Sequence, residues 1–212
     1  QALTGQPIVA LALPDDDEAD NAKLASAPAG AGGRSLVAPK AESLTPIRGF
    51  DLARYAALVN EVGAAGDAGA KAVLAKAGLD DAAFTRLNND WIDRMRTDPA
   101  LSGEYGTVYL EQSVGLLAAH GRAVAAAQRG RAKLGGEPPL SEADWLAMYR
   151  AQMALYADGK DYKAAALQFE ALAQAKGLRA YDFQVANWWW MTMAQQRAGA
   201  GDTSLAQKMS AR

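Results

Sequence analysis

Few residues of this 212-residue chain have the types and spacing that catalysis requires. His120 is the one histidine, in a stretch rich in Ala and Leu, and no Gly-x-Ser-x-Gly motif is present to expose a nucleophile. Cysteine is absent, which removes thiolate nucleophiles, disulfides and thiolate zinc sites. We therefore expect a structural role for His120 and predict a protein that is not an enzyme.

The carboxylates do not form the pattern of a known metal or cofactor site. The acidic run at 15–20 lacks the glycine and the terminal glutamate of a calcium loop. Asp90 and Asp93 share one face of an expected helix, as carboxylates on a solvated surface commonly do. The glycines at 29–33 follow no strand and precede no Lys-Ser/Thr pair for a phosphate. The sequence thus predicts no metal and no cofactor.

Charge and hydropathy exclude two classes of partner. The formal net charge is −2 with both signs interspersed, so no basic face is expected to bind nucleic acid. No apolar run approaches the roughly 20 residues that span a bilayer. The compartment stays open: a chain without cysteine suits cytoplasm and periplasm alike. We give the cytoplasm a slight preference, and the start at Gln1 leaves the periplasm or secretion as alternatives.

Residues 1–46 differ in composition from the rest of the chain. They hold five of the eight prolines and none of the sixteen aromatic residues, so they are expected to form an extended or disordered tail. An apolar run between Pro7 and Pro14 is the candidate docking strip for a partner, and its larger side chains are Ile8, Val9, Leu11 and Leu13. A plain linker and a remnant signal peptide are the alternatives.

From residue 47 onward, apolar residues recur with helical spacing, which predicts an all-α fold of about eight helices. We expect two antiparallel helical units, 47–130 and 140–212. The expected helices cover 51–63, 67–77, a third from Asp80, a long fourth from Pro99 to about Gln128, 141–158, 161–176, 180–197 and a short last one.

The two units share a motif at a constant offset of 99 residues. Gly-Leu-x4-Phe-x3-Asn-x2-Trp begins at Gly78 and again at Gly177. The expected duplicated core residues are Phe84, Asn88 and Trp91 in the first copy and Phe183, Asn187 and Trp190 in the second. Upstream, Leu52 and Tyr55 match Leu146 and Tyr149 at an offset of 94. Such a repeat indicates helical units stacked around one continuous core.

Two resemblances accompany this pattern. Asp161-Tyr162, Ala165 and Phe169 have the spacing of the second helix of a tetratricopeptide hairpin, which they resemble in degenerate form. Pro46-Ile47-x-Gly49-x-x-Leu52-x-x-Tyr55, continued by Gly78-Leu79, Trp91 and Asp98-Pro99-x-Leu101-x3-Tyr105, is similar to a bacterial family of small all-helical modules of unknown function. The family resemblance implies an all-α bacterial module and carries over no catalytic residue.

The triplet Trp188-Trp189-Trp190 is the main functional clue. With Phe183 at 0° on a helix of about 100° per residue, Trp190 lies on the same face as Phe183, which is expected to be buried. Trp188 falls at about 140° and Trp189 at about −120°, away from that face. The first copy has Asn89 and Asp90 at the matching positions. Trp188 and Trp189 are therefore candidates for a partner interface, with packing inside the same chain as the alternative.

These observations favour a non-enzymatic module that binds another protein. It could be an adaptor, a chaperone-like factor or a structural subunit of a bacterial assembly such as a secretion or injection apparatus, and self-association is also open. The alternative is an enzyme or small-molecule binder with an aromatic pocket between the two units.

Overall fold

The computed structural model describes residues 38–156 and 161–210, and within them the chain is helical. These residues form eight α-helices, a short 3-10 helix and no strand, which confirms the predicted all-α class. The elements in chain order are η1 (Ala41–Leu44), α2 (Leu52–Lys76), α3 (Asp81–Thr97), α4 (Pro99–Glu111), α5 (Ala118–Gln128), α6 (Glu142–Leu155), α7 (Tyr162–Gln174), α8 (Ala180–Gly199) and α9 (Ser204–Ser210).

One expected break is present and one expected helix is interrupted. The helices predicted at 51–63 and 67–77 are the two arms of α2, which meet at a kink where Gly66 has a non-helical backbone (φ 62°, ψ −176°). The single helix predicted from Pro99 to Gln128 is wrong, because the chain leaves the helix after Glu111 and re-enters it at Ala118. Gly115 in this connection has φ 74°, a left-handed conformation that glycine adopts without steric cost and that interrupts a helix.

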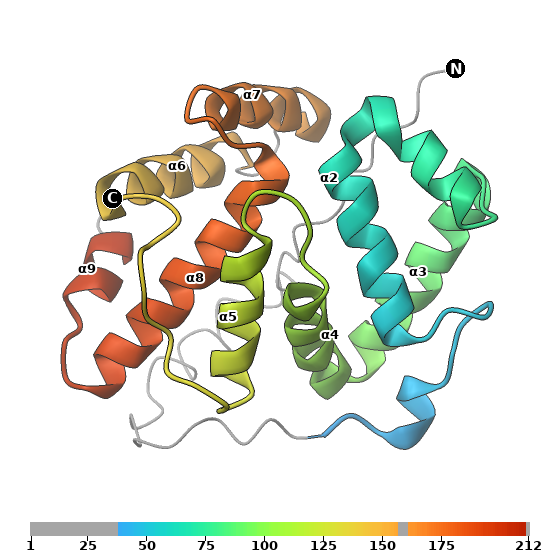
Figure 1. Cartoon of the computed structure of the whole chain (residues 1–212), viewed down its shortest axis with the longest axis horizontal. Helices are drawn as coiled ribbons and strands as arrows, with labels where there is room; N and C mark the ends of the chain where they lie inside the picture. The colour runs from blue at the N-terminus through green and yellow to red at the C-terminus, as the bar shows by residue number, and fades with distance from the viewer. Residues whose placement is uncertain (1–37, 157–160, 211–212) are drawn as a thin grey trace.

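The helices form a row with α8 near its middle (Figure 1). On one side, α8 packs against α6, α7 and α9. On the other it packs most extensively against α5, which packs in turn on α4, and α2 and α3 complete that end of the row. Since α8 has neighbours on opposite sides, it must bury more than one face.

The first of two hydrophobic clusters is organised around Trp91 on α3, which is fully buried. The ring of Tyr55 on α2 stacks on it, with centroids 5.5 Å apart and planes at 15°. The Tyr55 hydroxyl donates a hydrogen bond of 2.7 Å to Oδ1 of Asn88. This bond gives the buried phenol an acceptor and fixes how α2 lies along α3.

The same arrangement recurs in the second cluster, around Trp190 on α8. The ring of Trp145 on α6 stacks on it, with centroids 5.4 Å apart and planes at 16°. The Trp145 indole Nε1–H donates a hydrogen bond of 3.0 Å to Oδ1 of Asn187. An aromatic donor on one helix thus meets an asparagine and a tryptophan three residues apart in both halves of the chain.

This geometry corrects the register expected for the first helix of each half. Asp51 and Ser141 are the N-caps of α2 and α6, and their side chains accept from the backbone N–H three residues later. Tyr55 and Trp145 occupy equivalent places, so the offset is 90 residues and the predicted value of 94 is wrong. Matching by residue identity paired Tyr55 with Tyr149, which lies one turn too far along the same face.

The turns before the third helices agree with the predicted offset of 99. Gly78 and Gly177 both have positive φ, 76° and 72°. The N–H groups of Leu79 and Leu178 each donate to the carbonyl five residues earlier, at 2.9 and 3.0 Å. These bonds satisfy carbonyl groups that the helix end would otherwise leave without a partner.

The last helices also correspond, which the sequence did not predict. Asp98 and Asp202 each accept a hydrogen bond at Oδ1 from the backbone N–H two residues later, at the start of α4 and α9. Leu101 and Leu205, three residues after these aspartates, are both buried. With the two arms of α2 counted separately, the matched elements are four in each half, and α5 has no counterpart among the described residues.

A polar junction joins the halves. The hydroxyl of Tyr181 on α8 donates to Oδ1 of the buried Asn60 on α2 at 2.5 Å, and the same hydroxyl accepts from the N–H of Val114 at 3.1 Å. The Asn60 amide in turn donates to the carbonyl of Tyr109 at 2.9 Å. The Tyr109 side chain packs against both clusters, so the space between the halves is filled by side chains.

Candidate interaction surface

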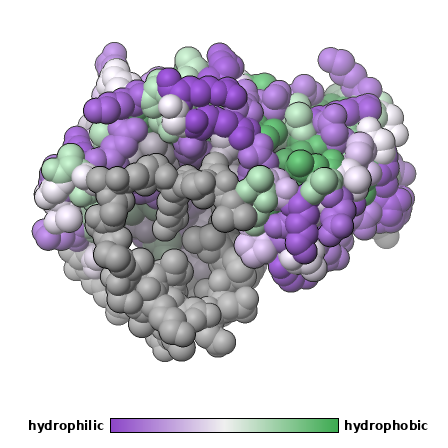
Figure 2. Space-filling view, turned by 90° about the horizontal axis from the view of Figure 1, so that it is seen from below, coloured by the Kyte–Doolittle hydropathy of each residue, from purple (hydrophilic) through white to green (hydrophobic). Residues whose placement is uncertain are grey.

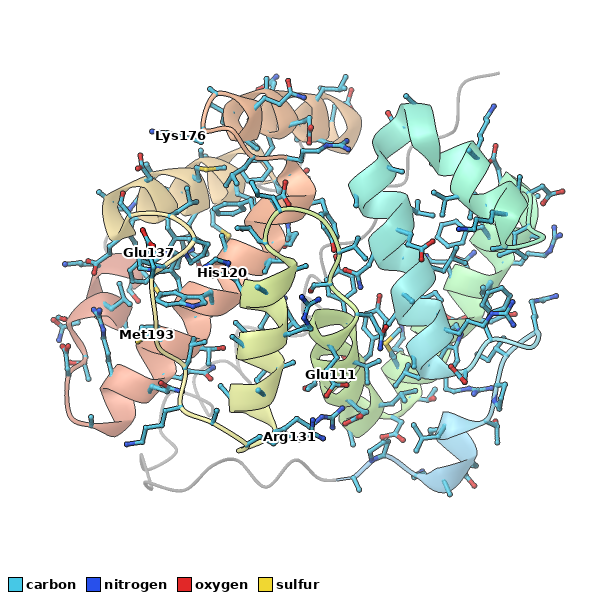
Figure 3. All side chains as sticks on the ribbon, viewed as in Figure 1. Glu111, His120, Arg131, Glu137, Lys176 and Met193 are labelled. Carbon is cyan, nitrogen blue, oxygen red and sulfur yellow. The ribbon has the colours of Figure 1, made fainter. Side chains whose placement is uncertain are left out.

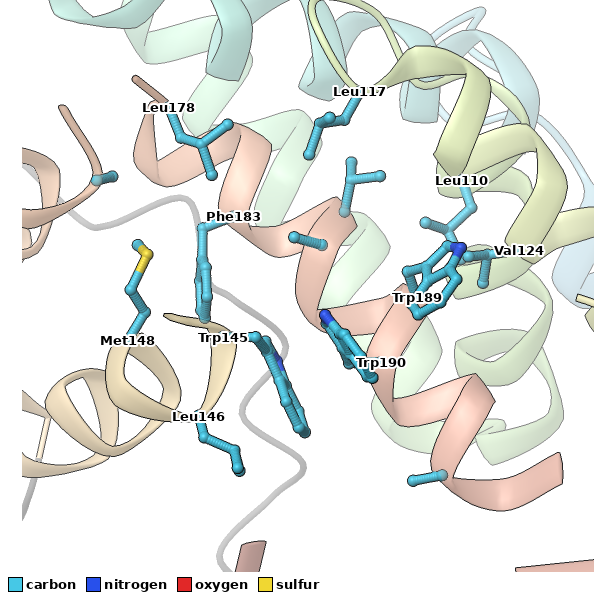
Figure 4. Packing of buried hydrophobic residues seen from close by; sticks show 14 of the residues in the cluster. Leu110, Leu117, Val124, Trp145, Leu146, Met148, Leu178, Phe183, Trp189 and Trp190 are labelled. Atoms are coloured by element: carbon cyan, nitrogen blue, oxygen red, sulfur yellow. The ribbon is translucent and has the colours of Figure 1, made fainter. Parts of the chain in front are cut away.

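The tryptophan triplet divides into three environments along α8. Trp190 points towards Trp145, and Trp189 leaves the helix towards Leu110 and Val124 (Figure 4). The two neighbouring indoles meet edge to face, with centroids 4.9 Å apart. Trp190 also donates from Nε1 to the carbonyl of Leu140 at 3.3 Å. It is thus a core residue, as the repeat motif predicted.

Trp189 does not face outward as expected, because it is only 3% exposed. The helical spacing predicted a single buried stripe on α8, whereas α5 covers a second one and Leu110 of α4 lies beside Trp189. Val185, one turn before Trp189, is also fully buried and marks this second stripe. Trp189 is therefore not accessible to a partner. It packs inside its own chain, which was the alternative to an interface role.

Trp188 remains at the surface with 37% of its area exposed. Its six-membered ring lies over Gly106 of α4, where a Cβ in place of the glycine hydrogen would be 3.8 Å from ring atoms Cζ2 and Cη2. Its solvent-facing part is thus the edge of an indole that already packs on its own chain. Trp188 is accessible, but it is a single aromatic rather than the aromatic face predicted from the triplet.

The other predicted interface residues, Ile8, Val9, Leu11 and Leu13, lie outside the described residues.

The duplicated core residues lie largely where the motif placed them. Trp91, Phe183 and Trp190 are buried, and Phe183 meets Phe169 edge to face at 5.1 Å. Phe84 is half-buried and packs at the edge of the first cluster. Asn88 and Asn187 are the half-buried acceptors of the two aromatic donors described above.

The structure adds a surface that the sequence reasoning did not single out, on the outer side of α6 and α7. A shallow, open groove of about 580 Å³ lies between these helices, and none of its lining residues is charged. The lining residues are Ala151, Ala154 and Leu155 on α6 and Gln168, Ala171 and Leu172 on α7. We call this the α6–α7 groove.

Exposed apolar side chains border the groove. Leu172 in its wall is 43% exposed, and Leu167, one turn before Ala171 on α7, is 63% exposed. Met153 is also exposed, but at about 100° per residue it lies on a different face of α6 from the groove residues. Single exposed apolar residues are common on protein surfaces, but Leu167 and Leu172 lie together on α7 at an uncharged groove, an arrangement that favours binding.

The first half of the chain provides a comparison for this patch. Residues 99 positions before Leu167 and Ala171 are Ala68 and Ala72, exposed on the second part of α2 beside Lys71. The residue 90 positions before Met153 is Gly63, whose surface is covered by the Tyr181 ring. Where the first half has small residues or a covered position, the second half therefore has large apolar side chains open to solvent.

The side of the molecule opposite α7 differs from the α6–α7 groove in the hydropathy of its surface. Figure 2 views it from below and shows hydrophilic residues over much of the described surface. Apolar residues gather there mainly towards the right of the view.

His120 lies on α5 beside the loop that carries Glu137 (Figure 3). Its Nε2 is 3.2 Å from the carbonyl oxygen of Glu137, so Nε2 carries the proton and donates. Nδ1 is then a buried acceptor without a hydrogen-bond partner among the described residues. Among residues 38–156 and 161–210, no carboxylate or hydroxyl forms a hydrogen bond with this ring.

The strongest charge cluster joins α4 to α5. Arg129 donates to both carboxylate oxygens of Glu104 at 2.8 Å and to Glu111 at 2.9 Å. The hydrogen bonds from Glu104 and then Glu111 raise the pKa of the Arg129 guanidinium. Arg131 is 3.7 Å from Glu111 (Figure 3). These groups pair with one another, so they act as a staple between two helices.

Metal sites and membrane spans are both absent from residues 38–156 and 161–210. No group of three or more histidine or acidic side chains in these ranges could hold a metal ion. No helix in the same ranges combines the length and the apolar character needed to cross a bilayer.

Comparison with known proteins gives no assignment: no protein family, curated protein or solved structure matches the chain.

The α6–α7 groove had a signal in the sequence. From residue 164 to residue 175, Glu170 is the sole charged residue, and it turns inward to accept from the N–H of Ala180 at 2.8 Å. A solvent-facing helix of this length normally carries several charges. The uncharged outer face of α7 could therefore be predicted from the sequence. The interface hypothesis relied on Trp188 and Trp189 instead.

Proposed function

We propose that this chain is a protein–protein interaction module and that the α6–α7 groove, with Leu167 beside it, is its contact surface. The observation that carries the proposal is the uncharged lining of a groove bordered by exposed Leu167 and Leu172. A partner that covers these side chains removes apolar area from water without stripping water from a charge.

The scale of this contact suits a reversible association. Burying one exposed leucine side chain contributes up to about 1.5–3 kcal/mol, and Leu167 and Leu172 are already partly covered. Association also costs translational and side-chain freedom. A helix or extended segment that fits two or three apolar side chains into the groove is therefore the kind of ligand we expect.

The rest of the chain serves as the scaffold in this proposal. We infer that the matched sets of helices come from an internal duplication, supported by the paired caps, turns and aromatic–asparagine contacts. In this proposal the second copy carries the contact surface, and the first copy has small residues at the matching positions. We also keep the proposal of a bacterial adaptor or structural subunit, which rests on the family resemblance.

The test is quantitative affinity capture from a lysate of the source cells. The variant Leu167→Glu/Leu172→Glu places charge in the groove, and Ala68→Glu/Ala72→Glu places the same charges on exposed positions of α2. We expect proteins recovered with the wild type and the α2 variant to be depleted with the groove variant, at equal thermal stability. Equal recovery with all three chains would overturn the proposal.

A further inference from the structure

We propose that the α6–α7 groove binds a segment of the same chain, Pro7 to Pro14, which competes in cis with any external partner. This inference rests on the proposed function, because it takes the groove to be the contact surface and adds the means by which access to it is regulated.

The segment and the groove match in chemistry. The lining of the groove is apolar except for Gln168 and carries no charge. Pro7 to Pro14 contains six consecutive apolar residues without a charge, and prolines delimit it on both sides. A groove between two helices accepts alternate side chains of an extended segment, and Leu11 and Leu13 are spaced to enter on the same side.

The chain between the segment and the folded part is long enough. The described chain begins at Ala38 and is anchored nearby, where the N–H of Lys40 donates to Oδ2 of Asp98 at 3.2 Å. From Leu13 to Ala38 an extended chain reaches about 80 Å at roughly 3.3 Å per residue. A compact domain of this size is about 40 Å across. The segment can therefore reach any point on the surface, at an effective concentration of the order of millimolar.

The charges that flank the segment and the groove also favour this docking. The acidic residues at 15–20 follow directly after the apolar segment. Arg150 is exposed on α6 one turn before Ala154, a groove residue, and its guanidinium donates to the carbonyl of Lys208 at 2.9 Å. Among the described residues no carboxylate lies within ion-pair distance of Arg150. A segment seated in the groove brings its acidic flank towards this cation.

The absence of cysteine makes a direct test clean. The full chain carrying Val9→Cys and Ala171→Cys places one thiol in the segment, on the same side as Leu11 and Leu13, and one in the groove. The control pair, Val9→Cys and Ala72→Cys, uses the matching exposed alanine of α2. Under mild oxidation we expect the intramolecular disulfide of the groove pair to form at least about tenfold faster than that of the control pair. Mass spectrometry of the linked peptides identifies each product.

A second change separates docking from a chance collision. Leu11→Asp/Leu13→Asp, added to the groove pair, should bring its cross-linking rate down to that of the control pair. Equal rates for the two original pairs would overturn the proposal, as would groove cross-links found only between two copies. Lysate capture is independent of this readout. A positive cross-link with failed capture would leave the groove to the chain's own segment, and the reverse would leave it to an external partner alone.

Discussion

The indole N–H of Trp145 and the side-chain oxygen of Asn187 form a hydrogen bond of 3.0 Å between α6 and α8. The pair repeats the bond from the Tyr55 hydroxyl to Asn88 in the first half, although the donor is a different residue type. The two halves thus share a hydrogen bond from an aromatic side chain to an asparagine, although the aromatic residues differ in type. An asparagine between two packed helices specifies one register, since sliding either helix would leave its partner's donor without an acceptor.

Replacing Asn187 with alanine should lower the free energy of unfolding by about 1–3 kcal/mol, because the buried indole N–H of Trp145 loses its acceptor. Asn88→Ala should have a similar effect through the Tyr55 hydroxyl. Urea denaturation followed by tryptophan fluorescence measures both. A change below about 0.5 kcal/mol in either variant would show that water replaces the amide oxygen there without cost.

The neighbouring tryptophans should respond very differently to truncation. Trp189→Ala opens a cavity between α8, α5 and α4 and should cost about 3–5 kcal/mol. Trp188→Ala removes a partly exposed ring from above Gly106 and should cost less than about 2 kcal/mol. Thermal unfolding of the two variants compares them. Equal losses would mean that Trp188 is as deeply packed as Trp189.

How far the sequence predicted this structure depended on how local each signal was. Asp51, Ser141, Gly78 and Gly177 act within four or five residues, so their caps and turns were predictable. The burial of Trp189 depends on α5, which is distant in sequence and has no counterpart among the described helices of the first half. No angular pattern within α8 could say which second face would be covered, and for this reason the interface hypothesis included the buried Trp189 beside the exposed Trp188.

A single methyl group at the kink of α2 should be costly. Gly66 has φ 62° and ψ −176°, and a Cβ there would overlap the guanidinium of Arg179, which donates to the carbonyl of Ala64. Gly66→Ala should therefore destabilise the chain by about 1–3 kcal/mol. Gly135→Ala is the control, since its φ is not positive and no atom lies within 4 Å of its Cβ position. Matching melting temperatures for the two variants would contradict this account.

The carboxylate of Asp98 should make the first half of the chain acid-sensitive. The Ser43 hydroxyl, and with it the N–H groups of Lys40 and Ala100, outweigh the burial that raises the pKa of Asp98 and hold it below its ordinary value. A folded-state pKa below the unfolded value of about 3.9 means that this stabilisation is complete above that pH. It is lost as the pH falls from about 4 towards the folded-state pKa.

Asp98→Asn isolates this contribution from that of the other carboxylates, which titrate equally in both chains. The variant should unfold at lower urea concentration than the wild type at about pH 6, because a neutral amide holds the N–H of Lys40 and the start of α4 less strongly. At about pH 3 the difference should shrink, since the wild-type carboxylate is then losing its charge as well. Midpoints measured at both pH values decide the matter: a gap that stays constant would show that the charge of Asp98 contributes nothing to the attachment of residues 40–45.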